Sequence, residues 1–257
     1  MRIIAVSTAL LYAVTTAQTV EECREDTPTP NATDVPYRFG IVLFRAADPI
    51  DYMGPDEVLF TLGRYTHVER SFIGEKLDPV TSEPLMPNRF NSSTWVSILP
   101  THTFATAPEV DVLLVPGGAG ARNPNLTTTI DFVRDTFPKV KYLMTVCTGA
   151  MIAAKAGILD GRRATTNKQA WLQVIALSNT TEWIGDARWV VDENVWTASG
   201  VASGIDAMLA FVRCKFGPAL ARNVTNAMEY MANSDPTNDP WAVYPNGTYI
   251  DPTLLTG

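Results

Sequence analysis

Short apolar runs alternate along the chain with segments whose apolar residues recur at helical spacing. The runs at residues 37–44 (YRFGIVLF) and 142–146 (YLMTV) are nearly continuous, as in parallel strands buried on both faces. The expected strands cover residues 37–44, 68–74, 95–99, 111–115, 142–146, 188–191 and 195–198. The expected helices cover residues 54–64, 126–137, 149–156, 202–216 and 218–232. This alternation predicts a single α/β domain, a doubly wound, mainly parallel sheet with helices on both faces.

The two ends of the chain have a different character from this domain. Arg2 precedes an apolar run at residues 3–14 and small residues at 15–17, which is typical of a secretory signal peptide. The run is shorter than the ~20 residues of a membrane span. We therefore expect a signal peptide over 1–17, an extended leader over 18–36, the α/β domain over 37–232 and a C-terminal strap over 233–257. No membrane association is expected once the signal is removed.

Glycosylation sequons also favour secretion. About two would be expected by chance from the asparagine, serine and threonine content. The sequence has more, with acceptor asparagines at Asn31, Asn91, Asn125, Asn179, Asn223 and Asn246. We expect an extracellular glycoprotein whose sequons lie on the surface. The net charge of −7 becomes −8 without Arg2, and it is spread along the chain, so a nucleic-acid partner is not expected.

The chain has three cysteines, an odd number for a secreted protein. Cys23 stands in a polar tail, where a lone cysteine has little reason to occur unless it is bonded, and Cys214 stands in a helical pattern. We predict a Cys23–Cys214 disulfide that ties the leader to the domain and leaves Cys147 free. In the chain-entropy model, a loop of roughly 190 residues makes such a bridge worth about 4–5 kcal/mol.

Cys147 comes directly after a buried strand, and small residues that begin a helix follow it (VCTGA). This strand–turn–helix pattern is that of a nucleophile elbow at the carboxyl end of the sheet. The helix N-terminus predicts a lowered thiol pKa. A buried structural cysteine fits the same residues equally well.

Two further segments carry candidate chemistry. Gly117 and Gly118 follow a buried strand, and their N–H groups could join that of Thr148 in an oxyanion-type site for the substrate, although such glycine pairs are usually simple turns. Asp51 stands just before Gly54-Pro55, where an acid ordinarily serves as a helix cap.

Taken together, these segments resemble a known family. DVLLVPGG, VCTGAMIAAKAGILDGRRATTN and TASGVASGIDAML resemble the ThiJ/PfpI superfamily, which has the class I glutamine amidotransferase-like (flavodoxin-like) fold. The resemblance covers residues 37–232, and the elbow and residues 50–55 are most similar to isonitrile hydratases. It implies that Cys147, Thr148 and Asp51 act together on a small electrophilic substrate without a cofactor, in a homodimer. The thiolate would add to an isonitrile, and a protonated Asp51 would supply the proton.

The chain also departs from the family pattern. Thr148 stands where family proteases carry histidine after the nucleophile, and Asn167 stands where many relatives carry histidine. His67 and His102 are the only histidines, and each is expected to be structural; no metal site is expected. Two alternatives therefore stay open, a cofactor-free glyoxalase acting on 2-oxoaldehydes and a non-enzymatic secreted protein with a redox-sensitive cysteine. Asp206 and Arg122 are interpreted as structural and solvated, respectively.

Overall fold

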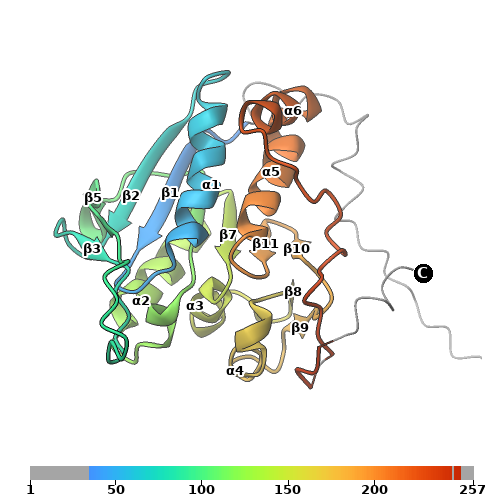
Figure 1. Cartoon of the computed structure of the whole chain (residues 1–257). Coiled ribbons are helices and arrows are strands. Elements are labelled where there is room, and N and C mark those ends of the chain that lie inside the picture. The colour runs from blue at the N-terminus through green and yellow to red at the C-terminus, as the bar shows by residue number, and fades with distance from the viewer. Residues whose placement is uncertain (1–34, 245, 250–257) are drawn as a thin grey trace, which may run out of the picture.

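The computed structural model describes residues 35–244 and 246–249. A seven-stranded sheet with the order β10-β11-β7-β6-β1-β2-β5 runs through the domain (Figure 1). Its strands are β1 Arg38–Leu43, β2 Glu69–Gly74, β5 His102–Thr103, β6 Val112–Val115, β7 Tyr142–Val146, β10 Trp189–Asp192 and β11 Val195–Ala198. Only the β10–β11 pair is antiparallel among these neighbours. The mainly parallel sheet predicted from the apolar runs is confirmed.

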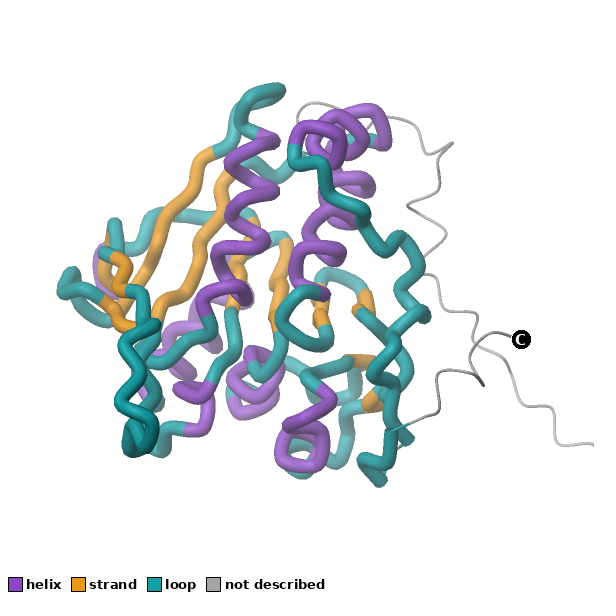
Figure 2. Tube along the Cα trace, in the orientation of Figure 1, coloured by secondary structure: helices purple, strands orange, loops and turns teal. Residues whose placement is uncertain are grey.

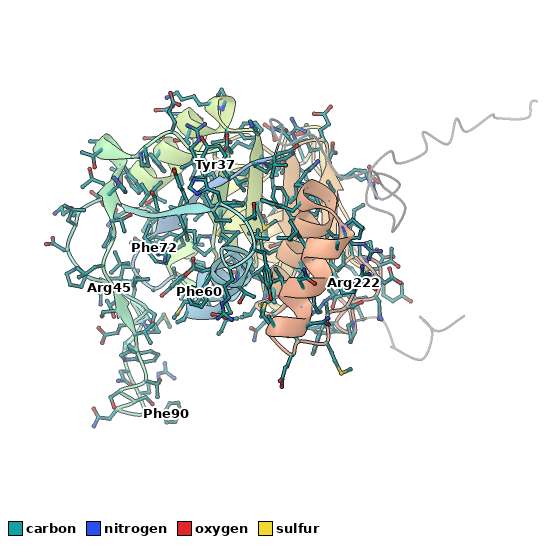
Figure 3. All side chains as sticks on the ribbon, turned by 90° about the horizontal axis from the view of Figure 1, so that it is seen from above. Tyr37, Arg45, Phe60, Phe72, Phe90 and Arg222 are labelled. Carbon is teal, nitrogen blue, oxygen red and sulfur yellow. The ribbon has the colours of Figure 1, made fainter. Side chains whose placement is uncertain are left out.

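Helices cover both faces of this sheet (Figures 1 and 3). They are α1 Pro49–Leu62, α2 Thr127–Thr136, α3 Gly149–Lys155, α4 Trp171–Ile175, α5 Ser203–Phe216 and α6 Pro218–Ala227. Helices α1, α5 and α6 pack together on one face, and α2 and α3 pack together on the other. Because both faces are covered, every residue of β6 is buried, which explains why this strand is a continuous apolar run.

Close helix packing beside the elbow depends on two glycines. A Cβ on Gly54 would lie 2.8 Å from the Ile205 side chain, and one on Gly204 would lie 2.8 Å from Val146. The glycines therefore let α1 approach α5, and let α5 approach the end of β7. This packing brings the first turn of α1 to the carboxyl end of the sheet.

Helix α1 begins earlier than the sequence pattern indicates. We expected it to start at residue 54, but it starts at Pro49, with Asp48 as the N-cap and its Oδ1 accepting from the Ile50 N–H at 3.1 Å. A capping acid followed by proline at the first helical position is a strong start signal, and it outweighs Gly54-Pro55. Asp51 thus lies inside the first turn rather than before the helix.

The expected strand at residues 95–99 is reduced to β4, Ser97–Ile98, which pairs with β3, Val80–Thr81. Between them, residues 82–96 form an arm that projects from the domain, with Phe90 91% exposed (Figure 3). Pro84 and Pro87 cannot donate to a ladder, which explains why the pairing stops at the base of the arm. A second small ladder joins β8, Arg163–Ala164, to β9, Glu182–Trp183.

After α6 the chain runs as loop along the side of the domain (Figure 2). Asp239 anchors this strap: it is 1% exposed, accepts a 2.8 Å hydrogen bond from Ser199, and pairs with Lys168 at 3.4 Å. The Val243 N–H donates to the Gly185 carbonyl at 3.0 Å. Buried polar contacts, rather than its exposed aromatic side chains, hold the strap. Within residues 35–244 and 246–249, no helix combines the length and apolarity of a membrane span.

The described residues include two of the three cysteines and five of the six sequon asparagines. Cys214 is disulfide-bonded and Cys147 is a free thiol. Cys23, the proposed partner of Cys214, lies outside the described residues, as do the expected signal peptide and Asn31. The other sequon asparagines are all exposed, namely Asn91, Asn125, Asn179, Asn223 and Asn246.

Candidate active site

Cys147 occupies the turn between β7 and α3 with a backbone φ of 58°. A non-glycine residue in this left-handed region is strained, so neighbouring groups must hold it there. The Cys147 N–H donates to the Ala198 carbonyl at 3.1 Å, and its carbonyl accepts from the Thr166 hydroxyl at 2.9 Å. The geometry is that of a nucleophile elbow. Its side chain nevertheless lies in an enclosed site, because Cys147 is only 6% exposed.

The glycine turn after β6 lies against this elbow. A Cβ on Gly117 would stand 2.4 Å from the Thr148 nitrogen, so only glycine fits there. The Gly117 N–H donates to Asp51 Oδ2 at 2.8 Å, and the Gly118 N–H donates to Thr148 Oγ1 at 2.8 Å. The Thr148 hydroxyl in turn donates to the Gly118 carbonyl at 3.0 Å.

These bonds correct the role expected for the glycines. We predicted that Gly117 and Gly118 would donate to the substrate as part of an oxyanion-type site. Both N–H groups are already engaged with side chains, so they position Asp51 and Thr148 instead. Sequence could show that backbone approaches closely here, but not which acceptor the N–H groups find.

Asp51 lies fully buried beside the thiol. Burial, assisted by the negative charge of Asp48, raises the pKa of Asp51 to about 8, although the Gly117 N–H and the Cys147 thiol partly oppose the shift. The carboxyl is therefore protonated at neutral pH. Its Oδ1 has no hydrogen-bond partner among the described residues, so this oxygen is the one left for a reacting molecule.

The pKa of Cys147 is also raised, chiefly by burial and then by the charge of Asp51. The nearby N–H and hydroxyl groups of Thr148 lower it only in part. The sequence-based prediction of a lowered pKa is thus wrong, because the thiol is desolvated and two acidic side chains, Asp51 and Asp48, lie near it. At neutral pH the resting pair is a thiol beside a carboxylic acid.

The histidines lie elsewhere. His67 precedes β2, at the end of the sheet opposite the elbow, and contacts Glu69. His102 is in β5, with β6, β1 and β2 between it and β7. Since the chain has no other histidine, no imidazole assists Cys147. Arg122 is exposed and donates to Gln173 Oε1 at 2.8 Å.

Thr166 is the contact that sequence reasoning missed. Its fully buried hydroxyl holds the carbonyl of Cys147, and the only sequence signal was its place in the ATTN segment. The next residue, Asn167, caps a short 3₁₀ turn by accepting from the Ala170 N–H at 3.0 Å. Asn167 therefore has a structural role as the cap of this turn.

Asp206, a buried acid at the start of α5, forms contacts that stabilise the fold. Asp206 accepts from Arg188 Nε at 2.7 Å and from the Tyr230 hydroxyl at 3.1 Å, in agreement with its structural interpretation. Within the part of the chain that the structure describes, no three His, Cys, Asp or Glu side chains gather as metal ligands would.

Several known proteins are similar to this chain in sequence. The profile of the DJ-1/PfpI family matches residues 41–214. An isonitrile hydratase of Pseudomonas putida is 33% identical over 195 residues, which are 75% of this chain and 78% of that protein. A deglycase of Pyrococcus horikoshii is 32% identical over 107 residues, 41% of this chain and 62% of that protein.

Solved structures have the same fold. A ThiJ/PfpI family protein from Pseudomonas syringae superposes with a TM-score of 0.63 at 26% identity, covering 79% of this chain and 82% of its own. DJ-1beta of Drosophila melanogaster superposes with a TM-score of 0.62 at 19% identity, covering 76% and 99%. The latter is a likeness of fold alone.

Proposed function

Because the chain belongs to the DJ-1/PfpI family, we propose that it is a cysteine-dependent hydratase that converts a small isocyanide to an N-substituted formamide. The observation that carries the proposal is the pairing of the Cys147 thiol with a carboxyl that burial keeps protonated. The similarity to an isonitrile hydratase along three quarters of the chain supports the same reaction.

An isocyanide suits this pair for a chemical reason. Its terminal carbon accepts both a nucleophile and a proton, so a sulfur and an acid must reach the same atom. Cys147 and Asp51 stand side by side, and Oδ1 of Asp51 is without a partner among the described residues. A buried carboxylic acid of raised pKa is a competent general acid at neutral pH.

In the first step, the Cys147 sulfur bonds to the terminal carbon. The thiol proton passes to one carboxyl oxygen of Asp51 while the proton on the other oxygen moves to the carbon. The product is a thioimidate, R–N=CH–S–Cys147, and Asp51 remains protonated. The carboxyl thus relays a proton without holding a charge in its buried position.

Water completes the reaction by the same relay. It attacks the thioimidate carbon and gives a proton to Asp51, which protonates the substrate nitrogen. The resulting R–NH–CH(OH)–S–Cys147 loses its hydroxyl proton to Asp51, the C–S bond breaks, and the sulfur takes the other carboxyl proton. The formamide R–NH–CHO leaves, and both groups return to their starting state.

Thr148 has the supporting role. Its single hydroxyl proton is donated to Gly118 at rest, and its N–H faces the sulfur. Rotation of the hydroxyl toward Cys147 would support negative charge as it develops on the sulfur. A glyoxalase-type reaction has less support, because its proton shuttle commonly uses a histidine and both histidines lie away from the thiol.

The test is turnover of an alkyl isocyanide, followed by loss of its N≡C infrared band and formation of the formamide. Methylglyoxal is assayed in parallel. We expect formamide from the wild type and none from Cys147→Ala. Formamide production by Cys147→Ala, or turnover of methylglyoxal alone, would reject the hydratase.

We further propose that the protein is a secreted glycoprotein that acts as a homodimer. The exposure of its described sequon asparagines supports the first part. A mass loss on enzymatic removal of N-linked sugars tests glycosylation, and light scattering tests the dimer. An unchanged mass or a monomer contradicts the corresponding part.

A further inference from the structure

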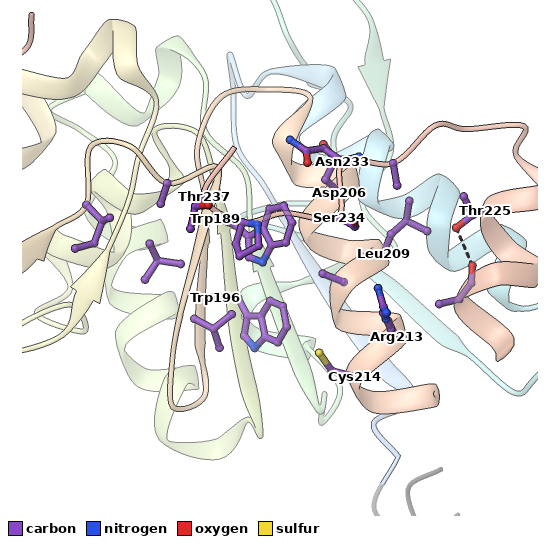
Figure 4. Close-up of a pocket in the computed structure, with 18 of the residues that line it drawn as sticks. Trp189, Trp196, Asp206, Leu209, Arg213, Cys214, Thr225, Asn233, Ser234 and Thr237 are labelled. Carbon is purple, nitrogen blue, oxygen red and sulfur yellow. Dashed lines mark hydrogen bonds between the residues drawn. The ribbon is translucent and has the colours of Figure 1, made fainter. Parts of the chain in front are cut away.

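A cavity of about 380 Å³ lies between the β10–β11 edge of the sheet and helices α5 and α6, and Cys147 does not line it (Figure 4). Its apolar walls include Trp189, Trp196, Leu209 and Ala221. This volume is within the range of cavities that hold several side chains or a small ligand. The proposed hydratase reaction has no use for it.

One wall of the cavity presents a buried donor. Trp196 is 3% exposed, and its indole Nε1 has no hydrogen-bond acceptor among the described residues. A buried indole N–H nearly always finds an acceptor in a native protein. No described residue supplies this acceptor, and a carbonyl or carboxylate oxygen brought close to the indole by an occupant of the cavity would do so.

Cys214 indicates which occupant this is. It also lines the cavity (Figure 4). Its sulfur is disulfide-bonded. The chain has three cysteines, and Cys147 is free. Within one chain, the remaining cysteine is Cys23, in the leader.

The charge and the length of the leader also favour it as the occupant of the cavity. Around Cys23 the leader carries Glu21, Glu22, Glu25 and Asp26 against a single Arg24. Three arginines line the cavity, Arg163, Arg213 and Arg222, against two acids, Asp186 and Asp206. Asp206 is already paired with Arg188. The residues from Cys23 to Val35 span up to ~40 Å when extended. Phe39 near the start of β1 contacts Phe211 of α5, the helix that carries Cys214, so the leader has only a short way to run.

We propose that this cavity is the docking site of residues 18–34 of the chain's own leader. Cys23 bonds to Cys214, and Val20, the nearest apolar leader residue, enters the space between the two indoles. A backbone carbonyl of the leader accepts from Trp196 Nε1, and the leader acids face the arginines. The occupied cavity closes the apolar gap between α5, α6 and the last strands.

The test uses the mature protein, purified with its leader from a secreting eukaryotic host. Digestion without reduction is expected to yield one peptide pair that joins Cys23 to Cys214 within a single chain. A free Cys23 thiol, or a link between two copies that vanishes on reduction, would overturn the proposal.

Occupancy is measured separately with the fluorescent apolar probe 1-anilinonaphthalene-8-sulfonate. Wild-type protein should bind it weakly, and Cys23→Ser should bind it several-fold more tightly. Adding Leu209→Trp to Cys23→Ser, which fills the cavity, should abolish the gain. If Cys23→Ser does not fold, gentle reduction of the wild type serves instead. Equal probe binding before and after loss of the disulfide would show that the leader does not occupy the cavity.

Discussion

The Gly117 N–H donates a 2.8 Å hydrogen bond to Oδ2 of Asp51, and this bond joins two segments that are far apart in the sequence. It leaves Oδ1 of the carboxyl without a partner in the described structure, on a residue that is fully buried. The same glycine lies against the Thr148 nitrogen. One backbone group thus sets the position of the acid relative to the elbow.

Gly117→Ala should abolish turnover. The added Cβ would lie 2.4 Å from the Thr148 nitrogen, so either the glycine turn or the elbow must move. A displacement of this size at a reacting pair costs about 100-fold or more in rate. The control is Gly63→Ala, whose Cβ meets its nearest neighbour at an ordinary 3.4 Å. A fully active Gly117→Ala enzyme would contradict the positioning role of this residue.

Asp51→Asn should be inactive yet more stable than the wild type at pH 8. Because the folded-state pKa of Asp51 is raised from 3.8 to about 8, the folded protein binds more protons than the unfolded chain between these values. The stability of the wild type must therefore fall as the pH rises through that window. From pH 5 to 8, we expect the wild type to lose on the order of 2–4 kcal/mol relative to Asp51→Asn. Urea unfolding at several pH values measures this difference, and parallel curves would refute a raised pKa.

The pH profile of turnover should fall at alkaline pH. The proposed relay needs the protonated form of Asp51, whose pKa is about 8. Above that value kcat/KM should drop by about tenfold per pH unit. A mechanism limited by formation of the Cys147 thiolate would behave in the opposite way, because the raised thiol pKa makes the rate climb with pH. A rise above pH 8 would therefore exclude the relay.

Thr166→Val should lower kcat while leaving KM nearly unchanged. The substitution keeps the shape of the side chain but removes the donor to the Cys147 carbonyl, which holds the strained backbone of the nucleophile. The lost hydrogen bond should cost about 1–3 kcal/mol of stability, and Thr166→Ser should restore the rate. Thr61→Val is the matched control, since Thr61 is equally buried but bonds to Glu57 in α1. Equal loss of activity in both variants would show a general effect on folding.

Asp239→Ala should destabilise the protein by about 3–5 kcal/mol, because it leaves the Lys168 ammonium buried without its charged partner. Burial already lowers the pKa of Lys168 to about 8 despite the opposing charge of Asp239. The double variant Lys168→Met/Asp239→Asn should recover most of the loss. Thermal unfolding of the single and double variants measures the coupling, and additive losses would argue against a pair.

The parts of the fold that the sequence predicted well are those where burial alone decides the structure. The run at 142–146 is a strand with those bounds, β7, and the expected helix at 202–216 is α5, Ser203–Phe216. Both are continuous in apolar pattern and have clear ends. The arm at 82–96 could not be predicted in this way, because its apolar side chains are exposed and the pattern that usually marks a buried strand misleads there.

The site was predictable in its members and not in its electrostatics. Cys147, Thr148 and Asp51 come together where parallel strands end, so the topology supplies their proximity. The direction of the Cys147 pKa shift depends on how deeply the thiol is desolvated, and the task of the Gly117 N–H depends on a residue 66 positions away. Neither the direction of the pKa shift nor the acceptor of the Gly117 N–H can be deduced from the spacing of residues near each position. Thr166 was missed for the same reason, since its acceptor lies in another segment.

The burial of Cys147 also affects how readily its thiol is oxidised. Peroxide attacks the thiolate form of accessible cysteines, and this sulfur is both protonated and 6% exposed. A protein that spent days in an oxidising medium would lose an open, ionised thiol to sulfenic and sulfonic acids. The buried, protonated sulfur of Cys147 should therefore oxidise slowly, because the proposed reaction makes it nucleophilic only when a substrate reaches it.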